Sequence, residues 1–282
     1  KQLMKWATVK NLTGKQPNEL IRPVGRNNEV YRLWTDGNIA SHEYFLVENR
    51  VRSGWDSALP ESGLLIYHID DAVGSLASND LQWSQFHPRI YPVSADGILE
   101  FIGGNFEPRV NTAWPGSLPN TTFSSTSSPN SRAYSGDKSY VEIKNIRVDT
   151  DKNIIADLRV KPTFRISRPR YGDEIFVNEP SLDVQMPYAV VPESLTITVN
   201  GVGLTEAPTY YNPVTKSMRV PLDRTTIGPL STGDYTVTIK GRETDETSQS
   251  EEEHYFRVRE KIIRRGLRMI SIPVALRPMY GE

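Results

Sequence analysis

The chain contains no cysteine, which excludes disulfide bonds, thiolate metal sites and cysteine nucleophiles. No apolar run approaches the roughly 18 to 20 residues that a membrane-spanning helix requires, so we expect no transmembrane segment. Neither sign of charge prevails, because 33 Lys and Arg are matched by 34 Asp and Glu, giving a net charge of −1. This balance argues against a nucleic-acid partner held by a uniformly basic surface.

Motifs of several enzyme classes are also missing. The sequence has no H-E-x-x-H, the pattern that places two imidazoles on one helix face to bind zinc. It has no G-x-S-x-G turn, and its glycine pairs lack the strand–loop–helix setting of a phosphate-binding loop. We therefore assign no catalytic residue and expect no peptide hydrolysis by this chain alone.

The residues that are present favour a mainly β protein. At roughly 150 residues per domain, 282 residues correspond to about two domains. Short β-type runs are bounded by Gly, Pro, Asn and Ser, and helical patterns are scarce apart from a predicted helix end over residues 1–10. The clearest predicted strands are Glu43–Arg50, Gly63–Asp70 and a hairpin of residues 141–146 and 153–160.

The segment 119–136 is rich in Ser, Thr, Asn and Pro, a composition typical of a loop. Two aromatic residues, Phe123 and Tyr134, can anchor it to the rest of the protein. We therefore predict an ordered surface loop rather than a linker.

A domain boundary is predicted near Lys161-Pro162, which separates a β-rich part, residues 1–162, from residues 163–260. In the second part, apolar residues alternate with polar ones over 195–199 and again over 235–239, and a last strand begins at His254. About seven short strands in this length predict an antiparallel β-sandwich. The polar and acidic residues 244–253 are predicted to form an exposed hairpin loop.

Titratable residues near the predicted strands are the candidates for chemistry. His68 and Asp70 stand two positions apart on one strand and therefore share a face. With His87 they form either a small metal or acid–base cluster, or a buried, hydrogen-bonded structural site. A hydrolase built on His68 and Asp70 has no identifiable nucleophile. Glu48 and Arg50 also share a strand face, and we expect them to pair.

Several acidic residues lie near the predicted strand ends. Calcium requires six to eight oxygen ligands in a flexible shell. The same residues could instead be solvated carboxylates of turns. A calcium site and a set of turn residues are therefore both open interpretations of Asp70, Asp71, Asp80 and Asp96.

One ordered set of motifs resembles a known family. EYFLVENR (43–50) is followed by GWD (54–56), LP (59–60) and GLLIYHID (63–70), and then by ADG (95–97), WPG (114–116) and the hairpin at 141–160. This order is similar to that in the secreted immune inhibitor A-like metallopeptidases of bacteria. In that family a strand of the type EYFLLENRQ precedes GFD…LPGSGLLIWHID. The resemblance covers about residues 1–160.

The resemblance implies that the zinc-binding helix lies upstream of this chain and that residues 1–162 are a β-rich domain supporting the protease unit. It implies a secreted or cell-surface bacterial protein whose parent is a zinc metallopeptidase, with the upstream catalytic region as partner. The family's acidic residues before its FPG motif are mostly replaced here, which argues against a calcium site of the family type at that place and leaves open a family member that has lost protease activity. Both ends of the chain are expected to be cuts within a longer polypeptide.

The segments PESLTITVNG (192–201) and GDYTVTI (233–239) make residues 163–260 resemble bacterial immunoglobulin-like domains, which serve as spacers or adhesion units. Residues 261–282 are predicted to be a linker and the first strand of a further module. The alternative hypothesis is therefore a structural or adhesive protein of the cell envelope, without enzymatic activity. In that hypothesis the apolar segment 266–276 adds to the sheet edge of a neighbour and drives self-assembly.

Overall fold

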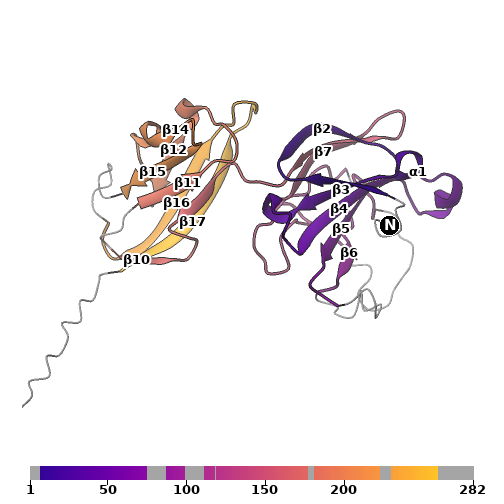
Figure 1. Ribbon diagram of the computed structural model, residues 1–282, viewed down its shortest axis with the longest axis horizontal. Coiled ribbons are helices and arrows are strands. Elements are labelled where there is room, and N and C mark those ends of the chain that lie inside the picture. Colours follow the sequence, from indigo (N-terminus) through magenta and orange to yellow (C-terminus); the bar gives the residue numbers. More distant parts are fainter. Residues whose placement is uncertain are drawn as a thin grey trace, which may run out of the picture. The chain divides into compact units, whose positions relative to one another are not determined.

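The computed structural model describes residues 7–74, 87–98, 111–117, 119–176, 181–222 and 230–259 (Figure 1). The chain divides into two compact units, Lys1–Pro162 (unit 1) and Thr163–Glu282 (unit 2), at the composition change near Lys161-Pro162. Strands predominate in both units, so the prediction of a mainly β fold is confirmed. No helix of the described residues combines the length and the apolar character needed to cross a membrane.

Unit 1 is built on two sheets, with the strand orders β1-β3-β4-β5-β6 and β2-β8-β7. The short helices α1 (Val24–Asn27), η1 (Thr35–Gly37) and η2 (Gly54–Ala58) lie in the connections between consecutive strands. The strands are β1 (Thr8–Leu12), β2 (Lys15–Ile21), β3 (Glu29–Trp34), β4 (Glu43–Arg50), β5 (Gly63–Asp70), β6 (Ile90–Pro92), β7 (Glu142–Val148) and β8 (Ile154–Arg159). The strands β3 to β6 lie side by side in Figure 1.

The central pair of unit 1 is β4 and β5, which have the bounds predicted from the sequence. They pair antiparallel along their full length, from Glu43 opposite Asp70 to Arg50 opposite Gly63. Residues directly opposite each other project from the same face. One face therefore contributes Phe45 to the main core, and the other contributes residues to a second cluster, which contains Trp34, Tyr44 and Ile69. Burial on both faces explains the continuous apolar run of β5.

The loop that follows residue 118 is anchored as predicted. The Phe123 side chain is fully buried, and its backbone exchanges two hydrogen bonds with Ile143. Its ring meets the edges of Phe45 and Trp114 at 5.2 and 5.5 Å between centroids. The second anchor, Tyr134, packs on the histidines described below.

The three-stranded sheet joins the first part of unit 1 to the last. β2 pairs antiparallel with β8, with Lys15 opposite Arg159 and Ile21 opposite Ile154. β8 in turn forms the predicted hairpin with β7. Ile21 and Ile154 are both fully buried in the main core of unit 1. This long-range pairing therefore brings residues from the first and last parts of unit 1 into one core.

Unit 2 is a two-layer β-sandwich of the predicted immunoglobulin-like type, antiparallel except where Glu174–Phe176 pairs parallel with Arg257–Arg259. Its sheets have the orders β10-β17-β16-β12-β13 and β14-β15-β11-β9. In the described part of this unit, one core of 18 buried residues draws on both sheets, for example through Val184 and Phe256. The strands are β9 (Arg165–Arg168), β10 (Glu174–Phe176), β11 (Ser181–Gln185), β12 (Thr196–Val199), β13 (Val202–Gly203), β14 (Tyr211–Asn212), β15 (Ser217–Pro221), β16 (Gly233–Gly241) and β17 (Ser250–Arg259), with the short helices η3 (Pro192–Ser194) and η4 (Ala207–Tyr210).

Two sequence predictions need correction. The helix end predicted over residues 1–10 is wrong for 8–10, because Thr8–Leu12 forms β1 and pairs parallel with β3. The exposed loop predicted over 244–253 ends earlier, because β17 begins at Ser250 and continues the ladder with β16. There Lys240 stands opposite Glu251, with 3.1 Å between Nζ and Oε2, so charged residues extend the strand on its exposed face. The apolar segment 266–276 lies outside the described residues.

Candidate functional site: a histidine–carboxylate cluster in unit 1

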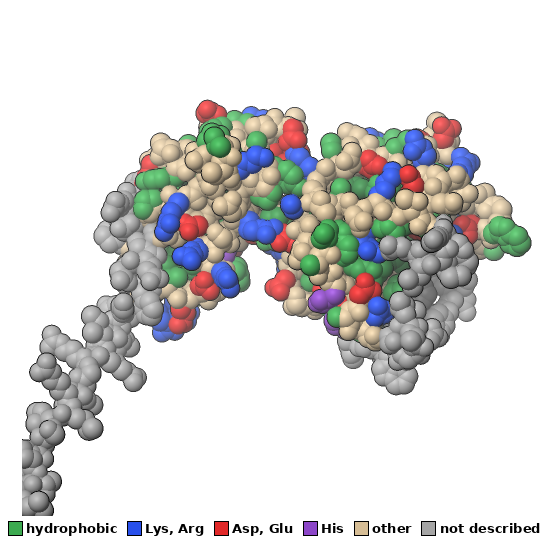
Figure 2. Space-filling model, in the orientation of Figure 1, with side chains coloured by type: hydrophobic (Ala, Val, Ile, Leu, Met, Phe, Trp, Pro, Cys, Tyr) green, Lys and Arg blue, Asp and Glu red, His purple; other side chains and the backbone are tan. Residues whose placement is uncertain are grey.

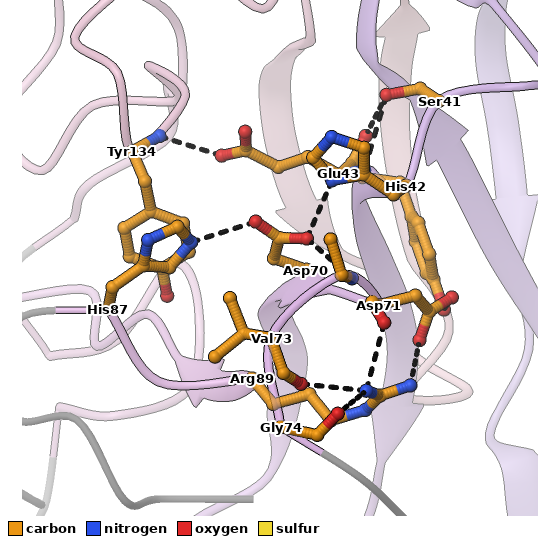
Figure 3. A network of polar contacts seen from close by, with 12 residues as sticks. Ser41, His42, Glu43, Asp70, Asp71, Val73, Gly74, His87, Arg89 and Tyr134 are labelled. Atoms are coloured by element: carbon orange, nitrogen blue, oxygen red, sulfur yellow. Dashed lines mark hydrogen bonds and ion pairs between the residues drawn. The ribbon is translucent and has the colours of Figure 1, made fainter.

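The register of β4 and β5 brings titratable residues together at one end of the central sheet. Glu43 begins β4 and stands opposite Asp70, the last residue of β5, and His68 lies two residues before Asp70 on the same face. His42 directly precedes β4, and His87 comes from the segment before β6 (Figure 3). We call His42, Glu43, His68, Asp70 and His87 the histidine–carboxylate cluster.

Asp70 is the centre of this cluster. Its side chain is 3% exposed, and its two carboxylate oxygens face different imidazoles. Oδ1 lies 2.6 Å from Nδ1 of His42, and Oδ2 lies 2.8 Å from Nε2 of His87. The backbone N–H of Ala72 also donates to Oδ1 at 2.8 Å. Asp70 thus holds two histidines in place at once (Figure 3).

The protonation states follow from these contacts. Burial raises the pKa of the Asp70 carboxyl, but the hydrogen bonds from Ala72, His42 and His87 outweigh it and the net pKa lies below the ordinary value. An ionised carboxylate only accepts hydrogen bonds. His42 therefore carries a hydrogen on Nδ1 and His87 carries one on Nε2. The second nitrogen of each ring therefore points away from Asp70.

His68 and Glu43 form a second contact of the same kind. Nε2 of His68 lies 2.7 Å from Oε1 of Glu43, which also accepts the backbone N–H of Tyr134 at 2.7 Å. The His68 ring is stacked between Phe45 and Tyr134, at 4.3 and 4.1 Å between centroids. The other partner of the Tyr134 ring is His87, at 4.0 Å. The cluster therefore sits against a column of rings that fixes the orientation of His68.

A buried arginine holds the turn that follows Asp70. Nη1 of Arg89 donates to the backbone carbonyls of Asp71, Val73 and Gly74, at 2.9, 2.7 and 3.2 Å. Nη2 of Arg89 donates to Oδ1 of Asp71 at 3.0 Å, and the Tyr44 hydroxyl donates to Oδ2 of Asp71 at 3.1 Å. Burial, followed by the charge of Asp71, raises the pKa of Tyr44 to about 12. The Asp71 carboxylate is therefore committed to this turn (Figure 3).

Glu48 and Arg50 form a separate network on the opposite face of the sheet. Nε of Arg50 donates to Oε1 of Glu48 at 3.0 Å, and Nη1 donates to Oδ2 of Asp56 at 2.7 Å. The Tyr67 hydroxyl donates to the same Glu48 oxygen at 3.2 Å. The pair expected from the sequence therefore exists, and it secures η2, on which Trp55 is fully exposed.

The acidic residues singled out from the sequence do not gather around a common point in the described part of the chain. Asp70 and Asp71 face different partners, and Asp96 accepts the backbone N–H of Ile98 at 3.0 Å, as a turn residue does. Asp80 lies outside the described residues. Of the predicted grouping, His87 contacts Asp70, whereas His68 contacts Glu43. His42 and Glu43 were not recognised from the sequence. Their role depends on the β4–β5 register, which pairs positions 27 residues apart.

Unit 2 offers one further group of titratable side chains and one buried histidine. Among the described residues, the group whose possible ligand atoms all lie within 4.8 Å is Glu243, Asp245 and Glu246. Glu243 is buried and accepts a hydrogen bond from Thr163 at 2.6 Å, while the other two are exposed. His254 is 6% exposed, and its Nε2 lies 2.8 Å from the carbonyl oxygen of Pro169. This histidine binds the backbone rather than a carboxylate.

Comparisons with known proteins add little to this geometry. No family model matches the sequence, and no curated protein matches it. Among solved structures, CopC from Methylosinus trichosporium OB3b is similar over 33% of this chain and 87% of CopC, with 15% identity and a TM-score of 0.25. A likeness of this degree supports no statement about function.

Proposed function

We propose that the chain is the non-catalytic C-terminal portion of a secreted bacterial metallopeptidase-like protein. Unit 1 supports the zinc-binding part, which lies upstream in the same polypeptide, and unit 2 is a spacer that holds the protease away from the cell or presents it to a surface. The zinc ion belongs to that upstream part.

One observation carries this proposal. The two motifs on which the family resemblance rests, EYFLVENR and GLLIYHID, are the adjacent central strands β4 and β5. Their charged residues contact other residues of unit 1: Glu48 with Arg50, His68 with Glu43, and Asp70 with two histidines. Charged side chains whose hydrogen-bond partners lie within the same unit are expected of a scaffold. A catalytic group, in contrast, must keep an atom available for substrate.

The experiment begins with the coding sequence upstream of Lys1. We expect an H-E-x-x-H motif within several hundred codons, preceded by a signal peptide. The full-length protein is then assayed on casein beside residues 1–282 alone, both with added zinc. We expect hydrolysis by the full-length protein only, and its loss when the glutamate of that motif is changed to alanine.

Two results would contradict the proposal. Zinc-dependent hydrolysis by residues 1–282 alone would show that this chain contains an active site of its own. An upstream region without H-E-x-x-H would leave the envelope-protein hypothesis, and self-association would then be compared with and without residues 262–282. Unchanged assembly of the shortened protein would exclude the segment 266–276 as its connector.

A further inference from the structure

Three of the four histidines in the chain meet at one end of the central sheet of unit 1. His42 and His87 are partly exposed, with 62% and 41% of their side chains accessible, whereas the Asp70 carboxylate between them is 3% exposed. Figure 2 shows histidine side chains at the surface of unit 1. Both imidazoles can therefore be reached from solvent, and the carboxylate that holds them is buried between them.

We propose that His42, Asp70 and His87 bind one divalent transition-metal ion of the Zn²⁺ class. Two imidazoles and a carboxylate suit zinc, copper and nickel, whereas calcium and magnesium require oxygen ligands. The site is distinct from the zinc site of the proposed function, since all three ligands belong to this chain, and it stands independently of that function.

The surrounding charges favour a cation. Three carboxylates, Glu43, Asp70 and Asp71, lie in or beside the cluster, and Arg89 is the guanidinium that pairs with Asp71. Within this group of described residues, the three carboxylates outnumber the one guanidinium, which leaves an excess of negative charge when the imidazoles are neutral. A bound dication neutralises this excess, much of which is held in a region of low solvent access.

The support around the ligands is already present. Ala72 fixes Oδ1 of Asp70, and the Tyr134 ring packs against His87. The Tyr134 hydroxyl is itself buried and has no hydrogen-bond partner among the described residues. Contacts of this kind orient the ligands of metal sites and tune their affinity.

Binding requires a limited rearrangement. The two imidazole nitrogens approach opposite oxygens of Asp70, and the three ligand atoms do not form a group within 4.8 Å. The rings of His42 and His87 rotate toward one side of Asp70, which brings their nitrogens to the same carboxylate oxygen. The carboxylate itself stays in place. On binding, the ion replaces the hydrogen on each coordinating nitrogen, and in the neutral ring that hydrogen moves to the other nitrogen.

The test is a calorimetric titration of the metal-free chain with Zn²⁺, joined to nitrogen NMR of the imidazole rings. We expect one ion per chain, and a change of tautomer at His42 and His87. H42Q and H87Q, each at a surface position, should weaken binding by more than about 100-fold, beyond the 10- to 100-fold that a supporting residue contributes. The control is D245N, which alters the acidic group of unit 2 and should leave the affinity unchanged.

Three results would overturn the proposal: no binding of Zn²⁺, equal binding by H42Q and H87Q, or loss of binding in D245N. The NMR spectra of the variants establish in the same experiment that unit 1 is folded. A variant with an intact spectrum and wild-type affinity therefore removes its residue from the ligand set.

Discussion

The histidines of unit 1 and the histidine of unit 2 are held by different partners. In unit 1, His42, His68 and His87 each contact a carboxylate side chain, and two of them reach the surface. In unit 2, His254 is buried and contacts the carbonyl oxygen of Pro169. A carbonyl contact ties the ring to the backbone of its own unit. A charged carboxylate, in contrast, orients the ring and still attracts cations, so the same residue type serves packing in one unit and a candidate site in the other.

The largest expected loss of stability comes from mutations in the two cores, and it tests whether each unit is stabilised by its own core. Phe45 and Phe256 are both fully buried, one in each core. Replacing either by alanine is expected to cost about 3–5 kcal/mol through lost contacts and a cavity. All five tryptophans lie within residues 1–162, so tryptophan fluorescence in urea reports unit 1 alone. Phe45→Ala should lower the midpoint of this transition, and Phe256→Ala should not. An equal shift in both variants would mean that the cores are coupled.

The next largest loss of stability is expected when the buried carboxylate of the cluster is replaced, in comparison with a carboxylate at the surface. In the absence of metal ions, Asp70→Asn is expected to destabilise unit 1 by about 1.5–3 kcal/mol, since it weakens hydrogen bonds to a buried charged group. Asp245→Asn, at an exposed position of unit 2, should change stability by about 0.5 kcal/mol or less. Urea unfolding in the presence of a chelator measures both. Similar values for the two variants would remove the distinction between the cluster and an ordinary surface.

A pH dependence is expected from unit 2. Burial lowers the pKa of His254 below its ordinary value of 6.5, and the hydrogen bond to the Pro169 carbonyl only partly opposes this. The unfolded chain therefore takes up a proton near pH 6.5 while the folded unit does not. The free energy of unfolding of unit 2 should fall as the pH drops below about 6.5, and level off below the folded pKa. Hydrogen exchange of amides in β16 and β17 measures it, and His254→Gln should remove this part of the slope.

The smallest effect is expected from exposed ion pairs, in which the units should not differ. Lys144 lies 2.8 Å from Glu142 in unit 1, and Lys240 lies 3.1 Å from Glu251 in unit 2. Solvent and salt screen both pairs, so replacing either lysine by alanine should cost about 1 kcal/mol or less. Thermal unfolding at low and high salt checks this. A larger loss in one unit would show that its charges act as a network.

The sequence predicts the strands well where their composition is decisive. β4 and β5 are bounded by polar or glycine residues, and the β7–β8 hairpin turns at a polar segment. The strand at Ser250–Glu253 was not predicted, because four consecutive polar residues are typical of a loop. They form a strand because each of them pairs with a residue of β16. Local composition contains no information about such a partner.

The candidate site was predicted in part. His68 and Asp70 share a face because of the two-residue period of a strand, and that relation is visible in the sequence. His42 could not be assigned, since its contact with Asp70 spans 28 positions and depends on the register of β4 against β5. The ring of Tyr134 contacts His68 from a loop, and a loop has no repeating sequence pattern from which its course could be predicted.

The pairing of β2 with β8 has a consequence for synthesis on the ribosome. β2 ends at Ile21, and its partner is complete only at Arg159. At about 5–20 residues per second, roughly 7 to 28 s separate the appearance of the two strands. During that interval Ile21, the buried residue of β2, lacks the strand that covers it. The core of unit 1 is therefore completed only when its last hairpin emerges, and the strands of unit 2 follow later.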